Sequence, residues 1–330
     1  MEDKKLYFIV GAQRSGTTLL SKLLNNHPDI HCMPEANFFI FFLHAFKDKR
    51  SFSGSDIELI FEQIYLYSLY HPWVGWEFDL EKTREEFYRD FTEKQISYVE
   101  LCKAIYEKFK VEGVGKENAS ILLDKNPIYS LFTEKIKSSI PDAKFILMIR
   151  DYRAHVLSRK QSVDFESPNI AFNALHWKLL NKIARKFQEE NPDRVLAVKY
   201  EDLIQNKKNE LNKICSFLNI SADEDIFENS VKYKADTAGF DIPQNFKKRL
   251  DKKYTDLDKP INTDRMDSWK TELTKNEILL CDAICGNFAK PLGYKTHFEQ
   301  GFLSERTIKL KHFPALLAAY LEIKKELIVY

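Results

Sequence analysis

The chain has 330 residues, 44% of them hydrophobic and 30% charged, proportions that are usual for a globular protein. The net charge is +1, so no general basic surface indicates a nucleic acid as partner. No apolar run approaches the ~20 residues of a membrane span. Composition therefore favours an ordinary globular fold and excludes two classes of protein, nucleic-acid-binding proteins with a generally basic surface and membrane-spanning proteins.

The first predicted element is a buried strand at residues 6–10, followed by a glycine loop at 11–16 and a helix from Thr17. Backbone N–H groups and a helix N-terminus then converge on one spot, which predicts an anion site. The spacing is nearly that of the phosphate loop G-x-x-x-x-G-K-[ST]. Thr17 and Thr18 stand where that motif continues with Lys, and the cation is Arg14 instead. We therefore expect a phosphate-type ligand whose terminal group is not held like an ATP γ-phosphate.

Further short apolar runs alternate with helical patterns along the chain. Strands are predicted at residues 30–33, 119–123, 144–149 and 194–199. Residues 36–118 are mostly helical by pattern and rich in aromatic side chains, residues 234–270 are predicted to be an irregular loop, and residues 313–327 a further helix. The alternation predicts a P-loop-like three-layer α/β/α fold with a mostly parallel central sheet and helical insertions.

Polar residues follow the predicted strands where those strands end. Glu35, Lys125 and Arg150 each occupy such a position, and ligands of open α/β sheets bind at this edge. Ser158 follows Arg150 after eight residues, so a guanidinium and a hydroxyl are available for a second phosphate. Taken singly, each has an ordinary alternative: a loop carboxylate, a solvated lysine, or a surface ion pair between Arg150 and Asp151.

These residues carry a resemblance to a known family. Gln-Arg-Ser-Gly-Thr-Thr-Leu-Leu (13–20) resembles the phosphosulfate loop of sulfotransferases that use PAPS (3′-phosphoadenosine 5′-phosphosulfate). Residues 145–158 resemble their 3′-phosphate segment. The similarity is greatest to the tyrosylprotein sulfotransferase-like and bacterial branch, which has a His-Pro-Asp after the first helix, a proposed base matched by Glu35, and a Lys before Pro matched by Lys125. Asp124 and Asn126, which flank that Lys, are exchanged relative to the tyrosylprotein enzymes.

Later motifs extend the resemblance over about residues 5–297. Val-Lys-Tyr-Glu-Asp-Leu (198–203), the stretch from Arg265 to Trp269, and Leu-Gly-Tyr (292–294) are similar to family segments. The resemblance implies a sulfotransferase domain at residues 1–297, with the helical insertion 36–118 on the acceptor side, and a C-terminal helical tail at 298–330.

The resemblance also implies roles. Glu35 would accept the proton of the acceptor hydroxyl, and Arg14 and Lys125 would neutralise the leaving group. PAPS would be the donor and PAP the product, with no metal required. The acceptor would be a hydroxyl of a glycan, a lipid, a small molecule or a tyrosine. The implied nucleotide-binding residues are Arg14, Ser15, Gly16, Thr17, Thr18, Arg150, Ser158, Tyr200, Arg265 and Trp269.

Two alternatives stay open at this point: a P-loop small-molecule kinase that uses ATP and Mg²⁺, and a nucleotide-binding protein without activity. The five cysteines are scattered, which favours a reducing compartment. The first strand begins within about six residues of Met1, so we expect no signal peptide. We therefore predict a cytoplasmic enzyme with no membrane span, and the oligomeric state is open.

Overall fold

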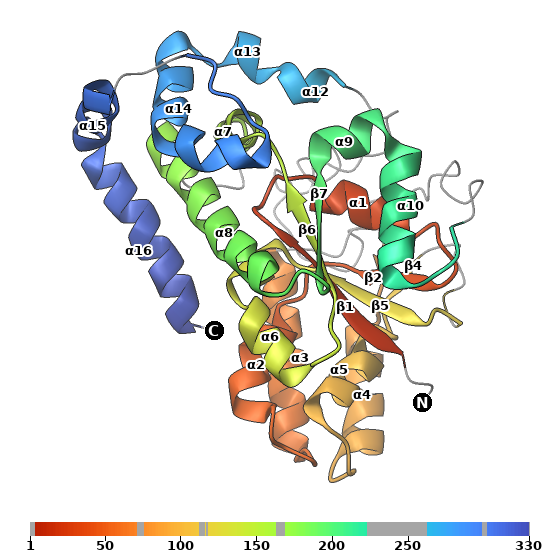
Figure 1. Cartoon of the computed structure of the whole chain (residues 1–330). Coiled ribbons are helices and arrows are strands. Elements are labelled where there is room, and N and C mark those ends of the chain that lie inside the picture. Colours follow the sequence, from red (N-terminus) through yellow and green to blue (C-terminus); the bar gives the residue numbers. More distant parts are fainter. Residues whose placement is uncertain are drawn as a thin grey trace.

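A computed structural model describes residues 4–70, 76–111, 116, 118–162, 169–222, 263–298 and 302–329 (Figure 1). The described residues form a five-stranded sheet in the order β2-β5-β1-β6-β7, and every neighbouring pair is parallel. The strands are β1 (Lys5–Gly11), β2 (Ile30–Met33), β5 (Ile121–Lys125), β6 (Phe145–Ile149) and β7 (Val195–Lys199). All five predicted strands are confirmed.

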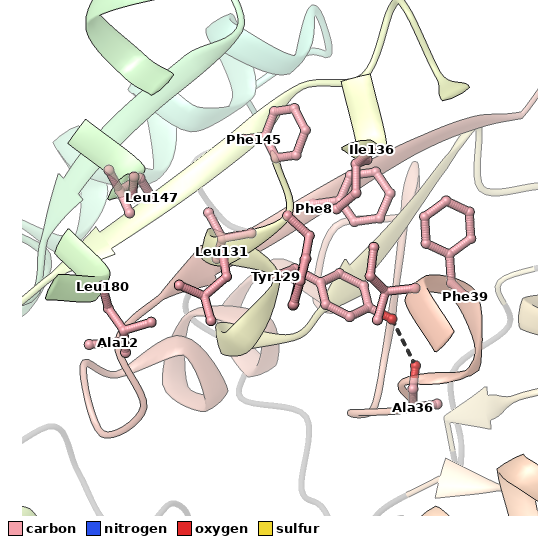
Figure 2. Close-up of a cluster of buried hydrophobic side chains, with 14 of the residues drawn as sticks. Phe8, Ala12, Ala36, Phe39, Tyr129, Leu131, Ile136, Phe145, Leu147 and Leu180 are labelled. Carbon is pink, nitrogen blue, oxygen red and sulfur yellow. Dashed lines mark hydrogen bonds between the residues drawn. The ribbon is translucent and has the colours of Figure 1, made fainter. Parts of the chain in front are cut away.

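The strands are buried on both faces, and alternate side chains enter two separate cores. On one face Phe8 stacks on Phe145 with ring centroids 5.5 Å apart, and Figure 2 shows this core around Tyr129 and Leu131. On the other face Ile9 packs with the helical leucines that follow the glycine loop. Helices therefore cover the sheet on both sides, which confirms the three-layer α/β/α prediction.

The second core is covered by α1 (Thr17–Leu24), α9 (Tyr200–Gln205) and α10 (Lys207–Leu218). The first core is covered by helices that include α2 (Phe38–Phe46), α5 (Tyr98–Tyr106), η1 (Pro127–Leu131), α6 (Thr133–Ser139), α7 (Tyr152–Lys160), α8 (Ile170–Glu190) and α14 (Lys275–Ala289). The remaining elements are α3 (Gly54–Tyr70), α4 (Leu80–Phe91), the antiparallel pair β3 (Trp76–Glu77) and β4 (Lys110–Val111), α12 (Asp264–Asp267), α13 (Trp269–Glu272), η2 (Lys290–Leu292), α15 (Phe302–Lys311) and α16 (Phe313–Val329).

The prediction for residues 234–270 is wrong at its end. Residues 264–267 form the short helix α12 and residues 269–272 form α13, because Trp269 is 3% exposed and fixes this segment against the core. Most of the predicted loop, residues 234–262, lies outside the described residues, as does Trp73 in the aromatic-rich region. The described part of residues 36–118 is mostly helical, as predicted.

The start of α7 shows how the local sequence prepares the site. The Asp151 carboxylate accepts a hydrogen bond from the backbone N–H of Arg153 at 2.8 Å, as expected of a helix cap. The same carboxylate pairs with the Arg153 guanidinium at 2.7 Å. Because the cap ends β6 sharply, Arg150 lies directly between the strand and the helix.

Candidate active site

The order of the strands places the predicted site residues in a row along one sheet edge. Parallel strands present their carboxyl ends on the same side and lie about 4.8 Å apart. Glu35 follows β2 and Lys125 ends β5, the glycine loop follows β1, Arg150 follows β6, and Tyr200 follows β7. Since the sheet order is β2-β5-β1-β6-β7, residues from distant parts of the chain become neighbours at this edge.

Glu35 and Lys125 form an ion pair at one end of the row. The Nζ of Lys125 lies 2.5 Å from Oε1 of Glu35. The Lys125 side chain is 6% exposed and that of Glu35 is 25% exposed, so the carboxylate still reaches solvent. The Tyr129 hydroxyl donates to the Ala36 carbonyl at 3.3 Å and fixes the backbone beside Glu35 (Figure 2).

The end of β2 is held by two further side chains. Asn25 donates to the carbonyl of Cys32 at 3.0 Å and accepts from its N–H at 2.7 Å. The Trp76 indole donates to the same carbonyl at 3.1 Å. Glu35 is therefore presented from a backbone whose position is determined by side chains of α1's C-cap region and of β3.

The loop after β1 requires glycine at two positions. Gly11 has φ +148°, and a Cβ there would lie 2.4 Å from the carbonyl oxygen of Met148. Gly16 has φ +93°, and a Cβ there would lie 2.5 Å from the ring of Tyr200. Both conformations and both contacts exclude a larger side chain. The two glycines allow the loop to pass close to β6 and α9.

The two motifs recognised in the sequence are joined by hydrogen bonds. Nε of Arg14 donates to the Ser158 hydroxyl at 3.0 Å. Arg150 donates to the Arg14 carbonyl at 3.2 Å and to the Arg265 carbonyl at 2.7 Å, and its guanidinium lies 4.4 Å from the centre of the Tyr200 ring. Arg150 and Ser158 are connected through Arg14, because Ser158 accepts from the Arg14 guanidinium and Arg150 donates to the Arg14 carbonyl. A shared role of Arg150 and Ser158 at a second phosphate stays a prediction.

The buried polar atoms of this site without a hydrogen-bond partner among the described residues include Oγ of Ser15 and Nε of Arg150. Buried polar groups are nearly always paired, so these atoms fit contacts to an anionic ligand. Burial lowers the pKa of Arg150. Burial, and after it the nearby charges of Arg159, His176, Arg150 and Arg14, hold the pKa of His155 well below its usual range. The site concentrates positive charge, as a nucleotide with several phosphate groups requires.

The remaining predicted nucleotide contacts lie around this cluster. Thr17 is buried at the first position of α1, and the carbonyl of Thr18 accepts from Ser21 at 2.9 Å. The Trp269 ring stacks on the Arg153 guanidinium, 3.9 Å from its central carbon. In this conformation the ring is engaged by Arg153, and its contact with an adenine stays a prediction.

Sequence reasoning assigned no role to Glu201, which organises the edge. One of its carboxylate oxygens accepts from the Asp151 N–H at 2.9 Å and the other from the Tyr294 hydroxyl at 2.8 Å. Burial raises the pKa of Glu201. Glu201 and Tyr294 are among the polar residues of the motifs 198–203 and 292–294, but only the fold shows that they meet at the end of β6.

The sulfotransferase family model matches residues 7–224. The chain belongs to the sulfotransferase family. A putative protein-tyrosine sulfotransferase of Caenorhabditis briggsae is 26% identical over 89% of this chain and 90% of the relative. Protein-tyrosine sulfotransferase 1 of Danio rerio is 24% identical over 90% of this chain and 74% of the relative. The sulfotransferase domain of the Synechococcus PCC 7002 olefin synthase superposes with a TM-score of 0.53 at 20% identity, covering 89% of this chain and 97% of that one, and shows the same fold.

Family membership identifies the chain as an enzyme that transfers a sulfuryl group from PAPS to an acceptor hydroxyl and leaves PAP. It sets aside the two alternatives, a kinase and a nucleotide-binding protein without activity. Within the described ranges, no three or more His, Cys, Asp or Glu side chains form a group that could hold a metal ion. No helix in the same ranges combines the length and apolar character needed to cross a bilayer.

Proposed function

We propose that Glu35 is the general base and that Lys125 and Arg14 are the cations that act on the donor. The observation that carries this proposal is the ion pair of Glu35 and Lys125 at the edge of the sheet, beside the loop that holds Arg14. A neighbouring ammonium group favours the charged form of a carboxylate, and only that form can accept a proton. PAPS supplies the sulfuryl group and a leaving phosphate on which charge develops, and cations placed there favour the transition state.

We further propose that the row of residues sets the direction in which the donor lies. The loop N–H groups with Ser15, Thr17 and Thr18 would hold the 5′-phosphosulfate. Arg150 and Ser158 would hold the 3′-phosphate, with Tyr200, Arg265 and Trp269 around the nucleoside. This direction is supported by the order of strands, because β1 lies between β5 and β6. Glu35 then stands at the acceptor end.

The domain assignment follows from the same order. We propose residues 1–297 as the catalytic domain, with the insertion 36–118 on the acceptor side because α2 begins three residues after Glu35. Residues 298–330 would form an added helical tail. The insertion presents exposed apolar side chains, such as Phe41 at 39% and Tyr65 at 47% exposure, which suit an acceptor with an apolar or ring-shaped part.

For the acceptor we propose a hydroxyl of a glycan, a lipid or a small molecule, modified in the cytoplasm. All five cysteines are free and buried, which supports a reducing compartment. The relatives named protein-tyrosine sulfotransferases keep tyrosine among the candidates. A panel of glycan, lipid, small-molecule and tyrosine-peptide acceptors with labelled PAPS tests the choice, and a preference for the tyrosine peptide would contradict it.

Replacing the proposed base tests its role directly. With an acceptor from that panel, Glu35→Gln should lower kcat by about 10²–10⁴-fold, because the acceptor proton loses its carboxylate. PAP affinity, measured by calorimetry, should be unchanged. Glu77→Gln, an exposed carboxylate of the same insertion, is the matched control and should retain full activity. Full activity of Glu35→Gln would remove the assignment.

Arg150→Ala tests the 3′-phosphate contact. Loss of a charge-assisted contact should weaken PAP binding by about 10- to 100-fold, whereas binding of adenosine 5′-phosphosulfate, which lacks the 3′-phosphate, should change little. Because Arg150 also holds the carbonyls of Arg14 and Arg265, the thermal midpoint of the variant is measured in parallel. Equal losses for both nucleotides would show that the arginine supports the loop and does not read the 3′-phosphate.

A further inference from the structure

Helix α16 has apolar side chains on two opposite faces. One face packs on α8, where Ala319 is fully buried and Ile323 is 4% exposed. Figure 1 shows α16 on the outside of α8, at the margin of the molecule. A helix that only completed a core would carry polar residues on its outer face, so the outer face of α16 needs another explanation.

The outer face is defined by five exposed side chains, which we call the α16 stripe: Phe313, Leu317, Tyr320, Leu321 and Ile328. Their exposed fractions are 57%, 43%, 45%, 55% and 82%. At 100° per residue these positions fall within a sector about 100° wide, on the side away from α8. Leu310 at the end of α15, 74% exposed, precedes the stripe. Leu310 and the five stripe residues make up six of the twelve large apolar side chains that are exposed in the described residues.

The charged residues within the stripe sector and at its nearer margin are basic. Lys324 lies inside the stripe sector, with its Nζ 5.7 Å from the centre of the Tyr320 ring, and Lys325 lies at the margin. Lys311 and Arg306 of α15 are also exposed. The acidic residues of α16, Glu322 and Glu326, lie outside the stripe sector, and Glu322 is 4.0 Å from His176 of α8. Glu305 of α15 pairs with Lys309 at 3.3 Å. The outward surface therefore combines apolar area with positive charge.

We propose that the α16 stripe docks the enzyme on the surface of an anionic lipid bilayer. Phenylalanine, leucine and isoleucine would enter the boundary between headgroups and acyl chains, and tyrosine suits that boundary because one end of its ring system is polar. Lys324 and Lys325 have long aliphatic stems, so their ammonium groups reach the lipid phosphates while the stems stay among the apolar side chains. The helix lies along the surface and does not span it.

The charge pattern decides between a bilayer and a second copy of the chain. Two copies meeting through the stripe would bring Lys324 and Lys325 of each near the same cations of the other, while Glu322 lies beside His176 of α8. Like charges brought together oppose association, whereas an anionic bilayer attracts each basic residue near its surface.

Vesicle sedimentation of the full chain tests the proposal. Binding is expected to vesicles of phosphatidylcholine mixed with phosphatidylglycerol, to weaken with added salt, and to be much weaker with phosphatidylcholine alone. The double variant Leu317→Glu/Leu321→Glu should lose at least about tenfold in partitioning, since charge enters the apolar stripe. Lys324→Glu/Lys325→Glu should lose about as much with anionic vesicles only.

Matched controls distinguish binding through the α16 stripe from non-specific adsorption to vesicles. Leu59→Glu on α3 changes a leucine of similar exposure, 49%, and Lys186→Glu changes an exposed lysine of α8; both should bind vesicles like the unmodified chain. PAP binding verifies that each variant is folded. The proposal is overturned if the unmodified chain binds neither vesicle, if the stripe variants bind as well as the controls, or if the stripe variants only convert a dimer to a monomer.

Discussion

Arg150 joins three parts of the active site with one guanidinium group. It holds the carbonyl of Arg14 in the phosphosulfate loop, the carbonyl of Arg265 in α12, and the face of the Tyr200 ring. Its Nε is left for a ligand. A 3′-phosphate bound to Arg150 would therefore be linked to the loop and to α12 through these existing hydrogen bonds.

Asp124 is a second residue near the site, and its burial makes the stability of the fold depend on pH. It is fully buried beside Lys125, and it accepts a hydrogen bond from the Tyr106 hydroxyl at 2.5 Å. Burial raises the pKa of Asp124 to about 7; Glu35 raises it further, while Tyr106 and Lys125 oppose the shift. In the unfolded chain the same carboxyl has its ordinary lower pKa. The folded state therefore binds more protons, and its stability falls as pH rises from about 4 to about 7.

Asp124→Asn should remove that dependence. The amide oxygen can still accept from Tyr106, and no charge is buried when the pH rises. The quantity to compare is the unfolding free energy of the variant minus that of the unmodified chain. This difference should be about 2–3 kcal/mol more favourable to the variant near pH 8 than near pH 5. Urea midpoints at the two pH values measure it. Asp48→Asn, whose side chain is 87% exposed, is the control. A larger gain at the lower pH would contradict the assignment.

At the scale of elements, α14 is fastened to α7 by one buried carboxylate. Asp282 of α14 accepts from the Tyr152 hydroxyl at 2.5 Å and lies 3.7 Å from the Arg153 guanidinium. It also accepts from the N–H groups of His297 and Phe298 at 2.8 and 3.0 Å. Arg153 in turn supports the Trp269 ring. One side chain therefore links two helices, the segment after η2, and the residues that follow α12.

Asp282→Ala should consequently lower the unfolding free energy by about 3–5 kcal/mol, because it leaves buried donors and part of a buried cation without their partner. Asp267→Ala removes an aspartate of α12 whose side chain is 65% exposed and pairs with Lys270, and should cost less than about 0.5 kcal/mol. Chemical denaturation followed by circular dichroism compares them. Similar losses for the two variants would show that the links of Asp282 contribute little.

The whole molecule is organised by the sheet edge at which the strands end. The proposed base, the glycine loop after β1 and the residues proposed for the 3′-phosphate lie along this edge, and two cores on either face of the sheet keep the strands in register. Because the site is assembled from four crossovers, ligand binding should stabilise the entire fold.

PAP should therefore raise the thermal midpoint, and it should do so in the presence of EDTA. At one hundred times its Kd, a ligand that binds only the folded state adds about 2.7 kcal/mol. The cations proposed for its phosphates are Arg14, Lys125 and Arg150, and these three residues would supply the positive charge. Differential scanning fluorimetry with PAP, with ATP and Mg²⁺, and with neither ligand measures the effect. A shift that needed Mg²⁺ would contradict the assignment of these three residues.

Much of the molecule was predictable from local sequence. The strands were visible as short apolar runs, and the glycine loop with Thr17 and Thr18 indicated an anion site whose cation is Arg14. Helix caps such as Asp151 were readable in the same way. These features depend on neighbours in the chain, so pattern and propensity are sufficient to predict them.

Only the tertiary structure decided which of these pieces meet. No local pattern states that Lys125 contacts Glu35 ninety residues away, that Ser158 bonds to Arg14, or that Glu201 joins Asp151 to Tyr294. Strand order and crossover connections set those contacts, and both are properties of the packed sheet. The outward stripe of α16 was likewise hidden, because a sequence shows two apolar faces on a helix but not which of them the core covers.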